Sequence, residues 1–428
     1  MRLNLAPLAL GALLAAAVPA LADLTIPALN YRTGPYAPSG IPYADGFSDY
    51  MTLVNERDGG VGGEIINVLE CETAYNTEKG VECYEQTKGE GALVYIPQST
   101  GITYQLIPKA SADEIPIWSV AYGRTSAVNG KVFEWVFNLP VTYWDGASVA
   151  VKYAMEEEGG SLDGKKIALV YHNSAYGKEP IRTLEKLSEK HGFELVLLPV
   201  DHPGQEQKAQ WLQIRRERPD YVLMWGWGVM NQVAIQEAAN IRYPMDKFIG
   251  VWWSGSEADV VPVGEGADGY KSLTFHGAGT EFPALQEIKA QVIDAGKGAG
   301  DGTKWGEVGY NKGVYTAAVV TEAIRHAQEM AGTAQITPRQ FRDAMETLEV
   351  TEAEFEALGL GGFAPAIALS CEGHSSPRLA AVQQWSAGEG KWTLLTDYME
   401  PDFEIVDPLI EEDSMAYAAE NNIAPRCE

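Results

Sequence analysis

The sequence predicts an α/β protein with two doubly wound, parallel-sheet lobes, and three observations lead to this fold class. Short apolar stretches typical of buried strands alternate with stretches of helical spacing through most of the chain. Such repetition builds parallel sheets that are covered by helices on both faces. The chain has 428 residues, 46% of them hydrophobic and 21% charged, which is the composition of a globular protein with more than one domain.

The expected elements follow this alternation in order. The first region predicts strands at 24–29 and 64–69, helices at 46–56 and 77–88, and a buried strand at 92–96. The second region predicts helices at 146–157, 180–191, 205–217 and 229–240, with strands at 166–171, 193–200, 221–225 and 248–252. The last region predicts helices at 282–296, 310–330 and 338–348, and then a strand pair at 380–385 and 392–396 around Gly388 and Gly390.

Ligands of such sheets bind outside the carboxyl ends of the strands, where the loops gather. The loops selected by this rule are 31–40, 97–101, 119–125, 226–228 and 253–257. We therefore expect the functional residues in these five loops.

Residues 1–22 have the pattern of a cleaved signal peptide. Arg2 gives a positive start, residues 5–21 form an apolar stretch, and Ala20-Leu21-Ala22 fits a small-residue cleavage site. No later apolar run approaches the roughly 18 residues that cross a bilayer. We therefore expect an exported, soluble protein.

The four cysteines, Cys71, Cys83, Cys371 and Cys427, are an even number in an oxidising compartment. Three pairings are open to them. The local pairing joins Cys71 to Cys83 and Cys371 to Cys427, and it is the natural expectation.

Charge and motifs exclude several function classes. The formal net charge of −27 disfavours nucleic-acid binding and docking on anionic membranes. Gly159, Gly164 and Lys165 have the spacing of a phosphate-binding loop, but the segment precedes a strand and lacks the Ser/Thr that follows the lysine. Cys371 and His374 lack the further ligands of a zinc site. We expect no enzyme, no cofactor and no metal, although an exported hydrolase with a triad from distant loops stays open as an alternative.

A specific resemblance begins at residues 33–40, which read Thr-Gly-Pro-Tyr-Ala-Pro-Ser-Gly, and continues through the glycine-rich run at 59–63. These residues resemble the opening of the branched-chain amino-acid-binding family of periplasmic ABC-transporter receptors. The resemblance extends through residues 97–101, 115–119 and 170–177, and it covers essentially the whole mature chain.

The resemblance implies the type I periplasmic binding fold, in which two lobes joined by three chain crossings close on a small ligand. Lobe one would comprise residues 23–140 and 272–348, and lobe two residues 141–271 and 349–428. It also implies a monomer in the periplasm that has an ABC permease of the inner membrane as its partner.

The first wall of the implied ligand site lies in lobe one. Ser99 and Thr100 follow the strand expected at 92–96 and start a helix, so their backbone N–H groups and hydroxyls can hold a carboxylate or, alternatively, only cap the helix. Tyr122, Gly123 and Thr125 match the family's next ligand loop. Tyr122 and Arg124 are larger than the residues usual in that loop, which argues against an aliphatic amino acid as the ligand.

Across the cleft, Glu257 matches the family's acidic residue that accepts hydrogen bonds from a ligand's ammonium group. The alternative for Glu257 is a solvated loop acid. Large aromatic residues at the neighbouring positions favour a flat or apolar ligand body. The aromatic residues that we expect to bind the ligand are Tyr36, Tyr143, Trp144, Trp225, Trp227 and Trp253.

The expected function is therefore that of a periplasmic solute-binding protein. It would deliver a small carboxylate-bearing ligand, an amino acid or an aromatic or amide-like relative, to an ABC importer. The alternative within the same fold is a sensory receptor that signals without transport.

Overall fold

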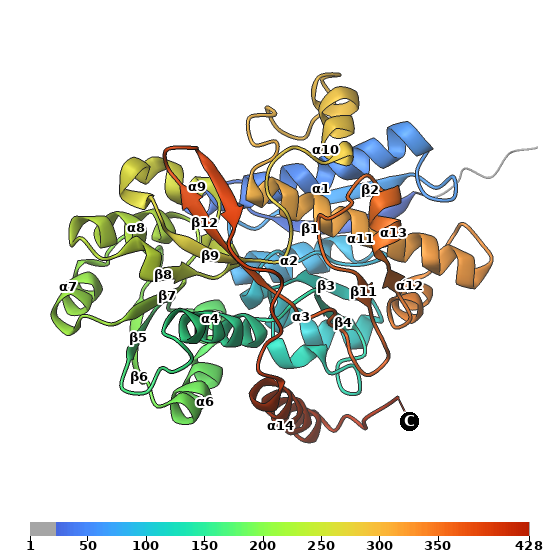
Figure 1. Ribbon diagram of the computed structural model, residues 1–428. Helices are drawn as coiled ribbons and strands as arrows, with labels where there is room; N and C mark the ends of the chain where they lie inside the picture. Colours follow the sequence, from blue (N-terminus) through green and yellow to red (C-terminus); the bar gives the residue numbers. More distant parts are fainter. Residues whose placement is uncertain (1–22, 428) are drawn as a thin grey trace, which may run out of the picture.

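Parallel strands form two groups in the computed structural model, which describes residues 23–427 (Figure 1). The predicted signal peptide at 1–22 lies outside the described residues. In the first group, β1 (Leu24–Asn30) pairs in parallel with β2 (Ile66–Glu72), and β3 (Ile117–Val120) pairs in parallel with β4 (Val136–Leu139). Residues 92–96 join the two pairs through isolated parallel bridges. The predicted strand therefore lies where it was expected but is not a regular one.

The second group is a seven-stranded sheet in the order β13-β12-β9-β8-β7-β5-β6. Its parallel strands are β5 (Lys166–His172), β6 (Glu194–Val200), β7 (Tyr221–Trp225), β8 (Phe248–Gly250) and β9 (Lys271–Thr274). The predicted closing pair is confirmed: β12 (Ala381–Ser386) runs antiparallel to both β13 (Lys391–Leu394) and β9. A short antiparallel pair, β10 (Glu349–Val350) and β11 (Ile367–Ala368), stands apart.

Helices follow most of the parallel strands, which confirms the predicted α/β fold class. The helices of the first half are α1 (Ala37–Asp58), α2 (Thr77–Thr87), α3 (Thr100–Asp113), α4 (Tyr143–Glu157), α5 (Ala175–Lys178), α6 (Ile181–His191) and α7 (Lys208–Glu217). Those of the second half are α8 (Val229–Asn240), α9 (Glu257–Val260), α10 (Pro283–Ile288), α11 (Val308–Ala331), α12 (Pro338–Met345), α13 (Glu352–Ala357) and α14 (Phe403–Asn421).

The helix predicted at 282–296 is divided into α10 and a π-helical segment at Lys289–Ile293. Helix α1 and strand β8 also differ from their predicted bounds, for local reasons. Helix α1 starts at Ala37, well before the predicted 46, because Pro38 stands in its first turn, where a missing N–H costs nothing. Strand β8 ends at Gly250 instead of continuing to 252, because the chain turns into the 3₁₀ helix η3 (Trp252–Ser254). This turn brings Trp253 to the carboxyl end of the sheet.

The two longest helices, α1 and α11, pack against each other at two glycines (Figure 1). A Cβ at Gly46 would lie 2.0 Å from the Tyr310 carbonyl oxygen, and one at Gly313 would lie 2.2 Å from the Tyr43 carbonyl oxygen. Helix α11 therefore belongs with the first strand group, although residues 59–307 of the chain separate the two helices.

The lobe boundaries at 140/141, 271/272 and 348/349 stay a prediction, and two elements bear on them. Strand β9 runs to Thr274 within the second sheet, so the boundary at 271/272 falls inside a strand. Helix α14, which the sequence did not predict, packs against α4 and α6 and also against the 3₁₀ helix η1 (Thr125–Val128) of the first group.

Both expected disulfides are present. Cys71 is bonded to Cys83, and Cys371 is bonded to Cys427 across 56 residues. The second disulfide anchors the segment that follows α14 to the loop after β11. The described chain has no free cysteine.

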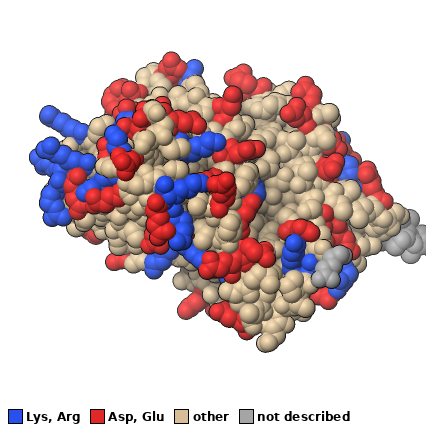
Figure 2. Space-filling view, turned by 60° about the horizontal axis from the view of Figure 1, so that its bottom comes forward, with Lys and Arg blue, Asp and Glu red and all other residues tan. Residues whose placement is uncertain are grey.

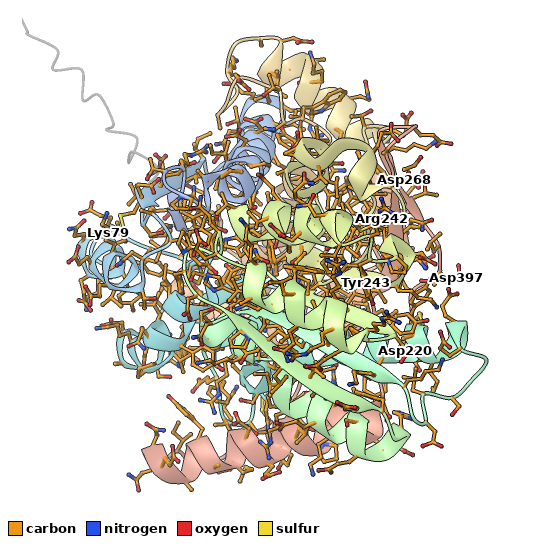
Figure 3. All side chains as sticks on the ribbon, turned by 90° about the vertical axis from the view of Figure 1, so that its left-hand side faces the viewer. Lys79, Asp220, Arg242, Tyr243, Asp268 and Asp397 are labelled. Carbon is orange, nitrogen blue, oxygen red and sulfur yellow. A yellow bond between two sulfur atoms is a disulfide. The ribbon has the colours of Figure 1, made fainter. Side chains whose placement is uncertain are left out.

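The amino ends of the second sheet's strands form the side of the molecule opposite the ligand loops. Asp220 precedes β7 and Tyr243 precedes β8, and both lie together with Arg242 on the side formed by α7 and α8 (Figure 3). The Tyr243 hydroxyl donates to the Pro219 carbonyl (3.2 Å), which ties these two turns together.

Acidic side chains are spread over the molecular face shown in Figure 2, and basic ones form one group in the middle of the face and another at the end where Figure 1 places α7. Arg215, Arg216 and Arg218 are exposed there. Among residues 23–427, no helix combines the length and apolar character needed to cross a bilayer.

Candidate functional site

An aromatic pocket lies at the carboxyl ends of both strand groups. It holds about 310 Å³ of empty space, counting the part that is open to solvent. The residues that line it are Tyr31, Tyr43, Tyr75, Gln98, Ser99, Thr100, Tyr122, Tyr143, Tyr176, Trp227 and Trp253. None of them is charged at neutral pH, because burial raises the pKa of the tyrosines further above the physiological range.

One end of the pocket is the start of α3. The Ser99 hydroxyl accepts from the Ile102 N–H at 3.5 Å, so Ser99 caps the helix as well as lining the pocket. Thr100 Oγ1 accepts from the Gly123 N–H (3.1 Å) and lies 3.3 Å from Tyr143 Oη. The N–H groups of the first turn of a helix have no intrahelical acceptor, so this end of the pocket favours a negatively charged group.

Backbone strain is concentrated around this end. Tyr75, Gln98 and Ala121 all have positive φ angles, of 59°, 39° and 52°. Left-handed conformations cost non-glycine residues about 1–3 kcal/mol and cluster at binding sites, where the surrounding structure holds them. Here the Gln98 N–H donates to Tyr122 Oη (2.8 Å), which brings the Tyr122 ring over the start of α3.

The opposite wall consists of two tryptophans from the second sheet. Trp227 follows β7 and Trp253 follows β8, and their rings meet edge to face with centroids 5.2 Å apart. The Trp253 indole N–H donates to the Ala121 carbonyl across the pocket (3.1 Å). The Trp227 indole N–H is buried and has no hydrogen-bond partner.

A histidine pair flanks one side of the pocket. Tyr36 Oη lies 2.9 Å from both His172 Nε2 and His202 Nδ1, and the Tyr36 ring packs against Tyr75. Burial lowers the pKa of His172 to about 3, so this side chain is neutral. The contact joins the start of α1 to the ends of β5 and β6.

A buried carboxyl flanks the other side. Glu179 is 7% exposed and accepts from the N–H of Thr125 (3.3 Å), from the Thr125 hydroxyl (2.7 Å) and from the Tyr104 hydroxyl. Its backbone carbonyl accepts from the Trp144 indole N–H (2.8 Å). Burial raises the pKa of Glu179 to about 7.

A third cluster lies behind Trp253. Lys312, on α11, is 2% exposed, donates to the Trp252 carbonyl (2.6 Å) and places its ammonium 4.3 Å from the Trp253 ring centroid. The Glu257 carboxylate accepts from the Val308 N–H (2.9 Å). Burial lowers the pKa of Lys312 and raises that of Glu257.

The structure brings together half of the residues that the sequence predicted for the ligand site. Ser99, Thr100, Tyr122, Tyr143, Trp227 and Trp253 line the pocket. The predicted residues that lie outside its lining are Tyr36, Gly123, Thr125, Trp144, Trp225 and Glu257.

The lining residues that the sequence interpretation missed are Tyr31, Tyr43, Tyr75, Gln98 and Tyr176. Tyr31 and Gln98 lie in two of the five loops that the strand-end rule selected, so the sequence already contained a signal for both residues. Tyr75 follows β2 in a loop that was not selected, and Tyr43 lies within α1, where only the packing shows that it faces the pocket.

In the described part of the chain, no three His, Cys, Asp or Glu side chains converge as a metal site would require. The polar groups that do converge on the pocket are hydroxyls, amides and indole N–H groups. Such a set can bind a small molecule by hydrogen bonding and ring contact.

Residues 23–390 match the family model of the periplasmic binding proteins, so the chain belongs to that family. The expected resemblance to branched-chain amino-acid receptors is confirmed. The family is one of binding proteins, so the expectation that the chain is no enzyme is confirmed at the level of the family.

One curated relative is Leu/Ile/Val-binding protein homolog 7 of Brucella suis biovar 1 (strain 1330). It is 26% identical over 264 residues, which are 58% of this chain and 64% of the relative. The aligned part of the chain thus spans less than two thirds of that relative's length.

Solved structures show the same fold over most of the chain. A protein described as an ABC transporter permease from the Pseudomonas fluorescens group is 39% identical with a TM-score of 0.87, covering 95% of this chain and all of that one. A branched-chain amino acid ABC transporter protein from Thermus thermophilus with bound valine is 20% identical, with a TM-score of 0.76 over 90% of this chain and 98% of that one. A solute-binding protein from R. palustris in complex with benzoate is 19% identical, with a TM-score of 0.68 over 89% of this chain and 97% of that one.

Proposed function

We propose that the protein is the solute-binding component of an ABC importer and that it captures a small carboxylate-bearing ligand between two lobes. The aromatic pocket carries this proposal, because its walls come from both strand groups and one end is the start of α3. A ligand that contacts both walls stabilises the closed arrangement more than an open one. The ligand-bound protein would then present both lobes to a permease.

The signal-peptide pattern of residues 1–22 and the family of the chain support export to the periplasm. Two relatives of the same fold are described with ligands of the proposed kind. The Thermus thermophilus protein holds valine and the R. palustris protein holds benzoate, and both molecules are small carboxylates.

Thermal-shift screening of the mature protein against amino acids, aromatic acids and short amides tests the proposal. We expect at least one carboxylate to raise the melting temperature, because a ligand that binds only the folded state stabilises it. Chemical turnover of that ligand would contradict a pure binding role. A panel in which amides bind and every carboxylate fails would contradict the proposed ligand class.

A further inference from the structure

We propose that the ligand of this pocket is a small aromatic carboxylic acid that carries no ammonium group. This inference rests on the solute-binding function proposed above and names the substrate class of the same site. Three properties of the pocket support it: its rings, its free donors and its lack of a carboxylate.

The rings set the shape of the ligand body. Eight of the eleven lining residues are tyrosine or tryptophan, and they come from both strand groups. Trp227 and Trp253 meet edge to face, while Tyr31 and Tyr75 pack around Trp227 with centroids 5.9 and 6.2 Å away. Aromatic walls make their best contacts with the face and edge of another flat ring.

The free donors set the charge at one end of the ligand. At the start of α3, a helix of 14 residues, the Ser99 hydroxyl caps the Ile102 N–H. The first-turn donors left for a ligand are therefore the N–H groups of Thr100 and Gly101. Independently, Trp227 lines the pocket with 5% of its surface exposed, and its indole N–H is buried without a hydrogen-bond partner. An indole N–H can only donate, so a ligand group that meets it must accept, and a carboxylate accepts from indole and backbone N–H groups alike.

The absence of a carboxylate in the lining argues against an ammonium group on the ligand. Neither Asp nor Glu lines the pocket, and the Glu257 carboxylate is engaged with the Val308 N–H instead. The Lys312 ammonium already lies 4.3 Å from the Trp253 ring centroid. The Glu179 carboxylate beside the pocket already accepts hydrogen bonds from two hydroxyls and a backbone N–H. Because Lys312 also covers the Trp253 ring, a ligand ammonium would be buried without a free partner, which is costly.

Titration calorimetry with three ligands of one skeleton tests the inference: 3-phenylpropanoate, L-phenylalanine and phenethylamine. Benzoate and the pair 4-methylpentanoate and L-leucine extend the series. We expect one of the aromatic acids to bind at least about 100-fold more tightly than any amine-bearing compound, because the latter buries an unpaired charge.

The outcomes separate the two proposals. If an amino acid binds more tightly than its amine-free analogue, or 4-methylpentanoate binds more tightly than both aromatic acids, the inference is overturned and the solute-binding function stands. If no carboxylate in the series raises the melting temperature or gives heat, the proposed carboxylate ligand is wrong and the inference is overturned with it.

Two variants test the residues that carry the argument. Trp227→Phe keeps a smaller aromatic ring at this position and removes the unpartnered indole N–H, so we expect about a 10-fold loss of affinity for the bound acid. Its matched control is Trp392→Phe on β13, since the Trp392 N–H is also buried and unpartnered but lies outside the pocket. An equal loss of affinity in both variants would overturn the role of the Trp227 N–H as a donor to the ligand.

Gln98→Glu places a carboxylate in the lining and is independent of the tryptophans. We expect it to weaken 3-phenylpropanoate and strengthen L-phenylalanine, so that their affinity ratio falls at least about 10-fold. An unchanged ratio in a variant that folds, as judged by its melting temperature, would overturn the charge argument.

Discussion

Glu179 shows at the scale of single residues how the tertiary structure reassigns a predicted role. The family resemblance placed Thr125 in a ligand-binding loop. In the structure, both Thr125 donors are directed at the Glu179 carboxylate, which comes from the other strand group. Donor chemistry could be predicted from residue type, whereas the identity of the acceptor depends on which loops meet.

Glu179→Gln should remove one pH-dependent contribution to stability. The pKa of the Glu179 carboxyl is about 7 in the folded state and 4.5 for the ordinary group, so the folded state binds the proton more tightly. Its contribution is present below pH 4.5 and is lost as the pH rises through 7. At most it amounts to about 3 kcal/mol.

We compare the free energy of unfolding of the parent protein with that of Glu179→Gln. The difference, parent minus variant, should decrease as the pH is raised from 5 to 8. Urea denaturation at four pH values measures this difference. The subtraction removes the opposite contribution of His172, whose pKa is lowered by burial and whose neutral form is favoured above pH 6.5. A difference that does not change with pH would contradict the raised pKa of Glu179.

At the scale of elements, the loop after β7 is the most constrained part of the site. Gly228 has a φ angle of 58°, and a Cβ at this position would lie 2.8 Å from the Tyr36 ring and 3.0 Å from the Pro35 carbonyl oxygen. The Val229 N–H donates to the same carbonyl at 3.3 Å. This is a close backbone approach between the two strand groups, and only glycine fits there.

Gly228→Ala should therefore weaken ligand binding by holding the two strand groups apart. The control is Gly264→Ala, because Gly264 has nearly the same backbone angles (φ 65°, ψ −137°) but nothing within 4 Å of its Cβ position. We expect both variants to lose about 1–3 kcal/mol of stability from backbone strain. Only Gly228→Ala should lose affinity in calorimetry, and an equal loss in both would contradict the role of this contact.

Elements with strong periodicity were predictable, and those defined by distant partners were not. The helix predicted at 180–191 matches α6 (Ile181–His191), because its apolar residues recur at helical spacing within one segment. The strand predicted at 92–96 is reduced to bridges, because its regularity depends on neighbours on both sides. Helix α14 was not predicted. It packs against α4 and α6 of the second group, and its Asp413 forms an ion pair with Arg124 of the first group (2.5 Å).

At the scale of the whole molecule, chain connectivity and covalent links hold the fold together. The Cys371–Cys427 bond closes 56 residues and fixes the segment after α14, whereas Cys71–Cys83 closes only 12. From the loop-closure entropy, the longer disulfide stabilises the folded state by about 4 kcal/mol and the shorter one by about 3 kcal/mol.

Replacing Cys371 and Cys427 by serine should lower the free energy of unfolding more than replacing Cys71 and Cys83. Guanidinium denaturation of the two double variants measures this order. Hydrogen exchange should increase first in α14, because the link anchors the chain that follows it. The reverse order of stability, or unchanged exchange in α14, would contradict the role assigned to the longer link.

The sequence by itself determined the fold class, the family and the end of the sheets at which the aromatic pocket lies, because strand–helix alternation and loop motifs are local patterns. It also determined that Ser99 and Thr100 start a helix. Only the tertiary structure decided which aromatic residues converge on the pocket, that Thr125 donates to Glu179, and that Glu257 lies outside the pocket lining. Those facts depend on the packing of segments that lie far apart along the chain, and spacing rules within one segment contain no information about such distances.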